Sequence, residues 1–348
     1  DIELFAQAAV APVIAVTGSN GKSTVVTLLG AMARSAGLDV RIGGTIGTPA
    51  LDLITQQEPD LYVLELSSFQ LEKVSSLRPQ AAAVLNVSAD HLDRYTDLQA
   101  YAAAKQSIFR QAAVQVFNLD DALVTSLVDQ AQPHTGFSCS VPNDDNYGLV
   151  AVEGQTWLAR GRRLIMPAAA ISMAGQHNLT NALAALAMGE ATGIPLASMI
   201  ETLTEFRGLP HRMQYLGSGN DVRWFNDSKG TNVGATLAAI EGIDEQLVLI
   251  AGGDGKGADF TPLAAAMQDR GRAAVLIGKD AGLLETLLQG VVPVRRATDM
   301  PEAVRFAAEL AQPGDCVLLS PACASTDMFR NFEQRGDVYM QAVQEYLS

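Results

Sequence analysis

Residues 13–24 constrain the fold of this chain more than any other stretch. They read VIAVTGSNGKST, an apolar β-branched run that breaks into glycines, a lysine and two hydroxyls before a helical pattern begins. In a strand–turn–helix of this kind, backbone N–H groups close on phosphate oxygens and the lysine supplies a positive charge. Either hydroxyl, that of Ser23 or that of Thr24, could hold Mg²⁺. The predicted phosphate site consists of Gly18, Ser19, Asn20, Gly21, Lys22, Ser23 and Thr24.

The loop departs from the usual phosphate-loop pattern at one position. The pattern G-x-x-x-x-G-K-[ST] would place its first glycine at Val16, whereas the glycine of this chain is Gly18. The alternative interpretation is an ordinary strand-to-helix turn with an incidental lysine. Because strand, loop and helix follow in the required order, we favour the phosphate site.

Composition limits the possible partners. The chain has 348 residues, of which 48% are hydrophobic, and this length suits two domains with a core each. A net charge of −14 argues against nucleic acid or an anionic membrane as the main partner, so small molecules are expected. The three cysteines, Cys139, Cys316 and Cys323, are widely spread and favour a reducing compartment. We therefore expect a cytoplasmic monomer.

Further apolar runs at residues 61–68, 81–87 and 114–118 predict buried strands of a mostly parallel sheet. Glu65 lies near the carboxyl end of the first of these strands. Because ligands of open α/β sheets gather at the carboxyl ends of strands, Glu65 is a candidate Mg²⁺ ligand. A structural ion pair is an equally good interpretation of this glutamate.

Other candidate residues follow the same strands. His91 comes just after the strand at 81–87, at the edge expected to carry the phosphate loop, which favours a functional histidine over a structural one. Lys105 lies in a helix predicted over 98–109 and is interpreted most simply as a solvent-exposed lysine. Asn178 and Asn181 lie in the first turn of an alanine-rich helix, where capping could explain one of them.

The pattern changes twice towards the C-terminus. Short alternating segments between residues 135 and 166 predict a small antiparallel subsheet attached to the first domain. A Gly/Pro break at 206–212 marks the boundary between a P-loop-type domain, residues 1–208, and a Rossmann-like α/β domain, residues 209–348. Strands of the second domain are predicted at 222–225, 246–251, 273–277 and 316–320. The glycines at 252–256 are a weak phosphate signal, and the small-residue turn at 320–326 suits a carboxylate.

Eight motifs in order, covering essentially the whole chain, resemble the Mur ligase family and its relatives the folylpolyglutamate synthases. They read TGSNGKST, LELSSFQ, NVSADHLDRY, GQHNLTNA, GLPHR, NDSKGTN, GGDGK and LSPACASTDMFRNFEQRG. The last motif favours the branch that adds D-glutamate to a nucleotide-sugar peptide. The resemblance implies an ATP-dependent ligase of peptidoglycan precursor synthesis, which activates a carboxylate as an acyl phosphate and forms an amide with D-glutamate. It also implies that domain closure assembles the site.

The resemblance also implies roles for individual residues. Lys22 and the loop amides would hold the ATP phosphates, Ser23 or Thr24 with Glu65 would hold one Mg²⁺, and His91 with Lys105 a second. In this family the lysine at the position of Lys105 is typically carbamylated. The implied nucleotide contacts are Asn178 and Asn181 to adenine, and Arg212 and Asp227 to phosphates and ribose. The implied D-glutamate contacts are Thr231, Lys256, Ser325 and Phe332.

Two departures from the family affect these expectations. Family members carry an N-terminal domain that binds uridine diphosphate, and residues 1–12 correspond only to a linker, so we expect Mg-ATP binding with poor turnover of the full substrate. Thr45 stands where such enzymes usually have asparagine, at a position that the resemblance implies makes a polar contact to the nucleotide sugar, so that contact is not carried over to this chain. The alternatives are a related amide ligase, such as a folylpolyglutamate synthase, or a non-catalytic nucleotide-binding module.

Overall fold

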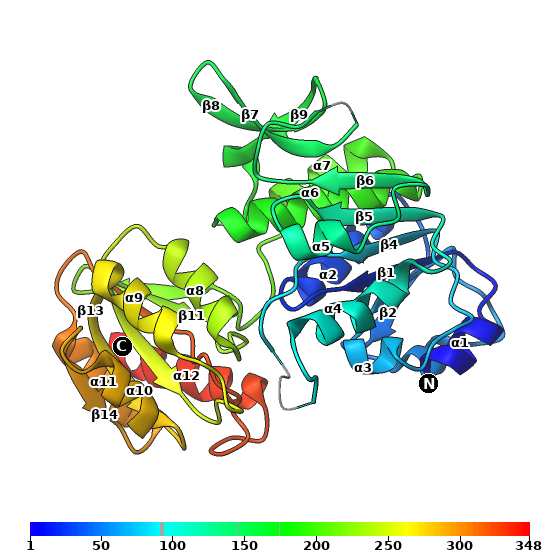
Figure 1. The fold of residues 1–348 in the computed structure, drawn as a ribbon. Coiled ribbons are helices and arrows are strands. Elements are labelled where there is room, and N and C mark those ends of the chain that lie inside the picture. The colour runs from blue at the N-terminus through cyan, green and yellow to red at the C-terminus, as the bar shows by residue number, and fades with distance from the viewer. Residues whose placement is uncertain (91–93, 144, 174) are drawn as a thin grey trace. The chain divides into compact units, whose positions relative to one another are not determined.

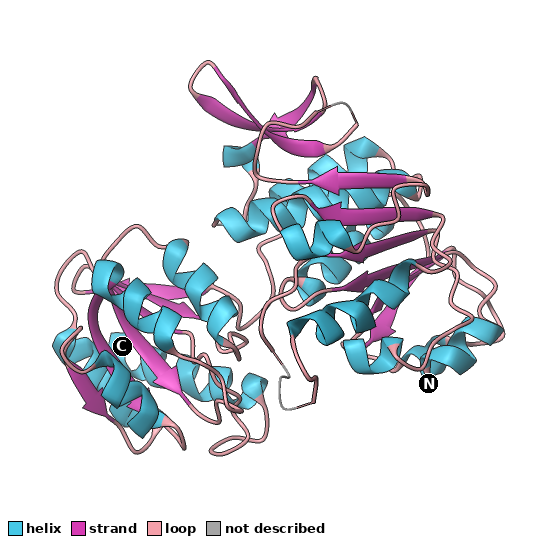
Figure 2. Cartoon of the chain, in the orientation of Figure 1, coloured by secondary structure: helices cyan, strands magenta, loops and turns pink. Residues whose placement is uncertain are grey.

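The computed structural model describes residues 1–90, 94–143, 145–173 and 175–348 (Figure 1). The chain divides into two compact units, Asp1–Arg207 and Gly208–Ser348. Helices and strands alternate in both units, and each unit is built on one sheet (Figure 2). The predicted α/β fold, with mostly parallel sheets and a small antiparallel part, is confirmed.

The strands of the first unit are β1 (Val13–Thr17), β2 (Val40–Gly44), β3 (Leu61–Glu65), β4 (Ala81–Val84), β5 (Val114–Asn118), β6 (His134–Phe137), β7 (Tyr147–Val152), β8 (Gln155–Arg160) and β9 (Arg163–Pro167). Its helices are α1 (Ile2–Ala8), α2 (Lys22–Ser35), α3 (Ser68–Leu71), α4 (Leu98–Gln106), α5 (Ala122–Ser126), α6 (Gln176–Ala191) and α7 (Leu196–Glu205), with 3₁₀ turns at Ala50–Leu53, Ser107–Phe109 and Ala168–Ala170.

Over the described residues, these strands form one sheet in the order β2-β3-β1-β4-β5-β6-β7-β8-β9. Neighbouring strands are parallel from β2 to β7, whereas β8 is antiparallel to both β7 and β9. The antiparallel part predicted within residues 135–166 is present. The antiparallel part continues the parallel sheet through the β6–β7 pair. β1 lies in the parallel part, between β3 and β4.

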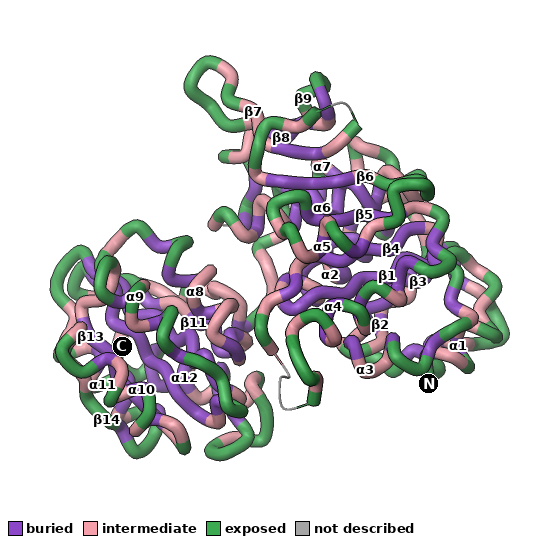
Figure 3. The backbone as a smooth tube through the Cα atoms, viewed as in Figure 1, coloured by how far each residue is buried: buried purple, intermediate pink, exposed green. Residues whose placement is uncertain are grey.

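The central strands are buried on both faces, as a parallel sheet covered by helices requires (Figure 3). In β1, Ile14 and Val16 belong to one apolar cluster and Val13 and Ala15 to another, because successive side chains point to opposite faces. The first cluster includes residues of α2, α6 and α7, and the second includes residues of α1, α3, α4 and α5. The loop that follows β1 is therefore anchored in the core.

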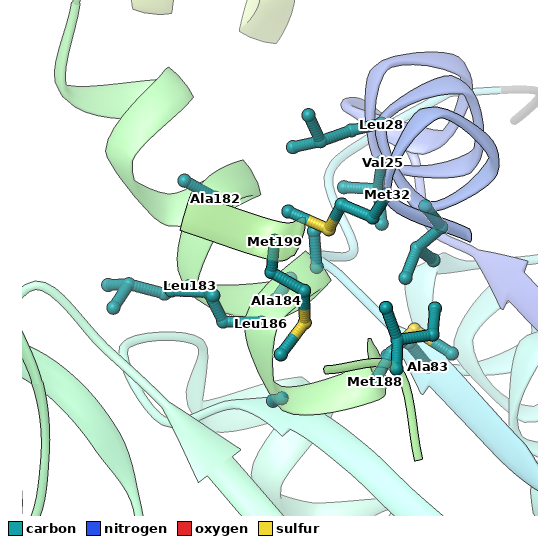
Figure 4. Packing of buried hydrophobic residues seen from close by; sticks show 14 of the residues in the cluster. Val25, Leu28, Met32, Ala83, Ala182, Leu183, Ala184, Leu186, Met188 and Met199 are labelled. Carbon is teal, nitrogen blue, oxygen red and sulfur yellow. The ribbon is translucent and has the colours of Figure 1, made fainter. Parts of the chain in front are cut away.

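Helices α2, α6 and α7 pack together on the first face of this sheet (Figure 4). Met32 of α2, Leu186 of α6 and Met199 of α7 are all buried in the cluster. Gly189 permits the close approach of α7, since a Cβ at that position would lie 2.4 Å from Sδ of Met199. This packing fixes α6 against α2, and with it the first turn of α6 relative to the phosphate loop.

The strands of the second unit are β10 (Gln214–Gly219), β11 (Val222–Asn226), β12 (Leu247–Gly252), β13 (Gly271–Ile277), β14 (Val294–Arg296) and β15 (Cys316–Leu319). Its helices are α8 (Val233–Glu241), α9 (Thr261–Arg270), α10 (Ala281–Leu288), α11 (Met300–Leu310) and α12 (Phe332–Leu347). The strand order is β10-β11-β15-β12-β13-β14, and every pair except β10–β11 is parallel. In β12, Leu249 faces the helices α8, α9 and α10, and Val248 faces α11 and α12.

The structure corrects several predicted boundaries. It adds β2, β10 and β14, which the sequence analysis did not predict. The strand predicted over 61–68 ends at Glu65, because Ser67 caps α3 in a reciprocal capping box with Gln70. The strand predicted over 81–87 ends at Val84. None of the helices in the described parts of the chain is long and apolar enough to cross a membrane.

Candidate active site

The phosphate loop joins the carboxyl end of β1 to the N-terminus of α2. Gly21, at the N-cap of α2, has a φ of +83°, and no side chain of the described residues caps the helix there. A left-handed conformation of this kind favours glycine. The uncapped first turn of this 14-residue helix leaves backbone N–H groups directed at the loop, where they can bind an anion.

Lys22 folds back over this loop. Its Nζ donates hydrogen bonds to the carbonyl oxygens of Gly18, at 2.8 Å, and Ser19, at 2.9 Å. The ammonium therefore lies directly above the backbone that would surround a phosphate. A phosphate group placed there would gain a charge-assisted contact with the lysine.

Asn86 and Ser88 brace the loop, although the sequence analysis gave neither residue a role. The Asn86 side chain accepts from the N–H of Asn20 at 2.7 Å and donates to the carbonyl of Asn20 at 3.0 Å. The Ser19 hydroxyl donates to the Ser88 carbonyl at 3.1 Å and accepts from the Ser88 N–H at 3.0 Å. The segment after β4 thus holds the phosphate loop by reciprocal hydrogen bonds. The signal that could have revealed Asn86 was a polar residue inside the apolar run at 81–87.

The interpretation of Lys105 as a solvent-exposed lysine is wrong. Its side chain is only 1% exposed, and its Nζ donates to the carbonyl of Gly18 at 3.0 Å. Nζ also lies 4.3 Å from the centroid of the Tyr101 ring. Burial lowers the pKa of Lys105 well below its ordinary value of 10.5, and the positive charge of Lys22 lowers it further. Such a lysine is neutral more readily than an exposed one and can act as a nucleophile or ligand.

Two buried oxygen atoms at this edge of the sheet suit a cation. Oε2 of Glu65 and Oγ1 of Thr24 are buried and have no hydrogen-bond partner among the described residues. Burying an unpartnered polar atom is unfavourable, so each of these oxygens is suited to a bound cation. Within the described residues no group of three or more His, Cys, Asp and Glu side chains could hold a metal alone. Phosphate oxygens of a bound nucleotide could complete the coordination. His91 lies outside the described residues.

The first turn of α6 contacts the phosphate loop. A Cβ at Gly21 would lie only 2.5 Å from Oδ1 of Asn181, and Asn181 donates to Oδ1 of Asn178 at 3.3 Å. Both asparagines are buried. The capping residue of α6 is Gly175, and no side-chain cap is present there among the described residues, so the structure gives neither asparagine a capping role. The structure therefore brings the Asn181 amide to the loop, and Asn178 is hydrogen-bonded to Asn181.

Thr45, the residue that departs from the family pattern, is exposed beside the end of β3. Its N–H donates to the carbonyl of Glu65 at 2.8 Å, and its hydroxyl donates to Oε1 of Gln70 at 2.7 Å. The hydroxyl is thus turned towards α3. In this arrangement Thr45 is part of the polar surface next to the candidate Mg²⁺ ligand.

In the second unit, Asp227 is buried at the carboxyl end of β11. Its carboxylate accepts from the Ser320 hydroxyl at 2.7 Å and from the N–H of Met213 at 3.3 Å. Burial raises the pKa of Asp227 from 3.8 to about 6, and the positive charge of Arg212 opposes that rise. Arg212 follows His211, which has a φ of +60°. Asp227 and Arg212 are thus close enough to interact electrostatically.

The four residues that the resemblance implies for binding the amino acid lie beyond the carboxyl ends of the strands of the second sheet. Thr231, Lys256 and Ser325 follow β11, β12 and β15, and Phe332 begins α12. The loops that carry them are joined: the Ala322 N–H donates to the carbonyl of Gly230 at 2.9 Å, and the β12 and β15 loops form an antiparallel bridge. The 16-residue helix α12 begins at Phe332, and the Asn331 side chain caps it by accepting from the N–H of Gln334 at 2.8 Å.

Arg335 holds this edge together, and the sequence analysis gave it no role. It is 1% exposed, and its guanidinium donates to the carbonyl of Ser228 at 2.7 Å, the Ser228 hydroxyl at 3.0 Å and the carbonyl of Cys323 at 3.1 Å. Burial lowers its pKa to about 10. Because Ser228 and Cys323 belong to the β11 and β15 loops, this arginine fixes the spacing between those loops.

Comparison with known proteins identifies the family to which both units belong. Residues 16–189 match the Mur ligase middle domain, and residues 211–323 match the Mur ligase glutamate ligase domain. The UDP-N-acetylmuramoylalanine–D-glutamate ligase of Nitrosococcus oceani is 57% identical over 350 residues, which span 100% of this chain and 77% of that protein. The chain belongs to the Mur ligase family. As a Mur ligase it is an ATP-dependent ligase.

A second relative and two solved structures are also similar to this chain. The UDP-N-acetylmuramoylalanine–D-glutamate ligase of Pseudomonas aeruginosa is 51% identical over 349 residues, which cover 99% of this chain and 78% of that protein. Among solved structures, MurF ligase from Thermotoga maritima in complex with ADP has a TM-score of 0.75 at 17% identity, covering 99% of this Mur ligase and 83% of that chain. E. coli FolC in complex with DHPP and ADP also has a TM-score of 0.75 at 17% identity, and the match covers 100% of this chain and 93% of the FolC chain. These structures show a shared fold.

Proposed function

We propose that this Mur ligase joins the L-alanine carboxylate of UDP-N-acetylmuramoyl-L-alanine to the amine of D-glutamate, consuming ATP. The observation that carries the proposal is the identity of 50–57%, across nearly the whole chain, to proteins named for this reaction. The collection of Thr231, Lys256, Ser325 and Phe332 at one sheet edge supports an amino-acid site in the second unit. Cytoplasmic location and a monomeric state remain predictions.

The proposed chemistry has two steps. Transfer of the terminal phosphoryl group of ATP to the carboxylate forms an acyl phosphate and ADP. The neutral amine of D-glutamate then attacks the acyl carbon; the C–N bond forms, the C–O bond to phosphate breaks, and the nitrogen loses a proton. Lys22 and the N–H groups at the start of α2 would offset the negative charge on the transferred group.

The nucleotide would lie along the phosphate loop. The support is geometric, since Asn181 contacts the loop at Gly21 and Asn178 is hydrogen-bonded to Asn181. We assign these two amides to adenine, whose ring edge offers both donors and acceptors. For Arg212 and Asp227, which interact electrostatically in the second unit, we keep the phosphate and ribose roles that the family resemblance implies.

The same proposal includes two Mg²⁺ ions. Glu65 would hold one ion together with Thr24, or with Ser23 as the alternative hydroxyl, and the buried unpartnered oxygens of Thr24 and Glu65 support this assignment. His91 and Lys105 would hold the second if the lysine is carbamylated. Bound Mg²⁺ would supply positive charge that stabilises the phosphates during transfer.

Carbamylation of Lys105 is consistent with its surroundings. A neutral amine can add carbon dioxide to give a carbamate anion and a proton, and burial favours the neutral form of this lysine. We expect a carbamate carbon signal in ¹³C NMR after incubation with ¹³C-bicarbonate, and its loss in Lys105→Ala. The exposed Lys73→Ala is the matched control and keeps the signal. A signal that persists in Lys105→Ala would disprove the assignment.

The substrate test compares amino-acid acceptors. Phosphate release by the full-length protein is measured with ATP, UDP-N-acetylmuramoyl-L-alanine and either D-glutamate or L-glutamate, and separately with a folate and L-glutamate. We expect release only with D-glutamate, and its loss in Lys256→Met. Release that depends on folate would assign the chain to the folylpolyglutamate synthase reaction. ATP binding without release under any condition would support the non-catalytic alternative.

A further inference from the structure

The turn Gly278–Asp280, between β13 and α10, contacts the loop that carries Lys256. The N–H of Gly255 donates to Oδ2 of Asp280 at 2.7 Å, and the N–H of Asp280 donates to the carbonyl of Gly253 at 3.0 Å. The contact therefore involves both the side chain and the backbone of Asp280. This turn holds the β12 loop just before Lys256.

Lys279 of the same turn reaches a second loop. Its Nζ donates to Oδ2 of Asp254 in the β12 loop at 3.0 Å. Its backbone N–H donates to Oδ2 of Asp327 in the β15 loop at 2.8 Å. The loop that carries Ser325 is therefore held by the same three-residue turn that holds the loop of Lys256.

Asp254 completes the connection between the two loops. Its Oδ1 accepts from the N–H of Lys256 at 3.0 Å, and its backbone exchanges hydrogen bonds of 3.0 and 2.8 Å with Ala324, the neighbour of Ser325. Lys256 has a φ of +51°, an unfavourable conformation for a lysine that needs support from its surroundings. The position of Lys256 thus depends on Asp254, which in turn is held by Lys279.

These loops are packed too closely to adjust independently. Gly278 has a φ of +77°, and a Cβ there would lie 2.5 Å from Oδ2 of Asp327 and 2.8 Å from Cα of Gly253. The carboxylates of Asp254, Asp280 and Asp327 all accept hydrogen bonds from protein N–H groups. Their role in this structure is to join three loops.

We infer that the turn Gly278–Asp280 is a positioning element of the amino-acid site, in which Lys279 and Asp280 fix the spacing between Lys256 and Ser325. The inference rests on the proposed function, because it takes Lys256 and Ser325 as the residues that bind D-glutamate. Holding both residues in place before binding lowers the ordering cost of capturing the amino acid. The turn acts through other residues and does not contact the substrate.

The test measures the kinetics of D-glutamate-dependent phosphate release by the full-length protein. Asp280→Ala leaves the N–H of Gly255 without the carboxylate that accepts its hydrogen bond. If D-glutamate binding must restore the loop position, the loss of this bond raises KM for D-glutamate about tenfold. KM for ATP stays unchanged. Asp280→Asn keeps an acceptor oxygen and restores most of the affinity. Lys279→Met removes an exposed ion pair and raises the same KM by about two- to fivefold.

The control variant is Arg305→Met, which removes an exposed cation whose ion pairs with described residues, Glu302 and Glu309, lie within α11, and it leaves both KM values unchanged. If Asp280→Ala does not fold, Lys279→Met decides the question. The inference is wrong if the unaltered protein uses D-glutamate and both substitutions leave its KM unchanged. It is also wrong if KM for ATP rises equally, or if Asp280→Asn fails to restore affinity. If D-glutamate does not stimulate phosphate release by the unaltered protein, the proposed function is wrong instead.

Discussion

Asn86→Ala tests whether the phosphate loop is held in its binding conformation by the segment after β4. The substitution removes two hydrogen bonds, one from the N–H of Asn20 at 2.7 Å and one to its carbonyl at 3.0 Å. At about 1 kcal/mol for each bond, the loss is about 2 kcal/mol. If ATP binding must restore the loop conformation, the Kd for Mg-ATP rises by about 30-fold.

Asn118→Ala is a matched control for this variant. Asn118 ends the neighbouring strand β5, and its side chain also makes two backbone hydrogen bonds, to the carbonyl of Leu85 at 3.1 Å and from the N–H of Asp120 at 2.9 Å. Neither bond reaches the phosphate loop. Both variants should lose about 1–3 kcal/mol of stability in thermal denaturation. Isothermal titration calorimetry should find weaker ATP binding only in Asn86→Ala, and equal affinities in the two variants would refute the reasoning.

Three further substitutions test other parts of the account. Glu65→Gln keeps the shape of the side chain but removes its charge, and should weaken Mg²⁺-dependent ATP binding at least about tenfold while leaving metal-free ATP binding unchanged in calorimetry. Asp227 is protonated more readily when folded, with a pKa of about 6 against 3.8, so its contribution to stability is present below pH 4 and lost as pH rises through 6. Urea denaturation should therefore show Asp227→Asn gaining about 2 kcal/mol relative to the unaltered protein between pH 4 and pH 7, and a constant difference would contradict this. Met199→Ala should cost about 2–5 kcal/mol in thermal denaturation, whereas the exposed Leu283→Ala should change stability by less than about 0.5 kcal/mol.

The parts of the fold that local patterns determine could be predicted from the sequence. Residues 13–24 predicted β1, the loop and the start of α2, because a buried strand, glycines and a helical pattern follow one another directly. The missed strands β2, β10 and β14 are all edge strands of their sheets. An edge strand is covered on fewer sides, so it needs fewer apolar residues and its pattern is weak. β10, for example, reads QYLGSG.

The candidate site was predictable as a set of motif residues but not as a set of contacts. Lys105 lies in a helix whose small and polar residues resemble a solvent-exposed surface, and only the packing of α4 against the loop after β1 buries its ammonium. Asn86 and Arg335 were missed for a related reason. Both donate or accept hydrogen bonds with the backbone of loops that are distant in the sequence. Because every residue type has the same backbone groups, the sequence of those loops does not indicate which side chain they bond.

The central claim is that ATP activates the substrate carboxylate as an acyl phosphate at the loop after β1. Its most direct test uses UDP-N-acetylmuramoyl-L-alanine with both oxygens of the L-alanine carboxylate labelled with ¹⁸O, together with ATP and D-glutamate. Mass spectrometry of the products from the full-length protein should find one ¹⁸O in each released phosphate and the other in the new amide. Unlabelled phosphate, or AMP and pyrophosphate as products, would contradict the account.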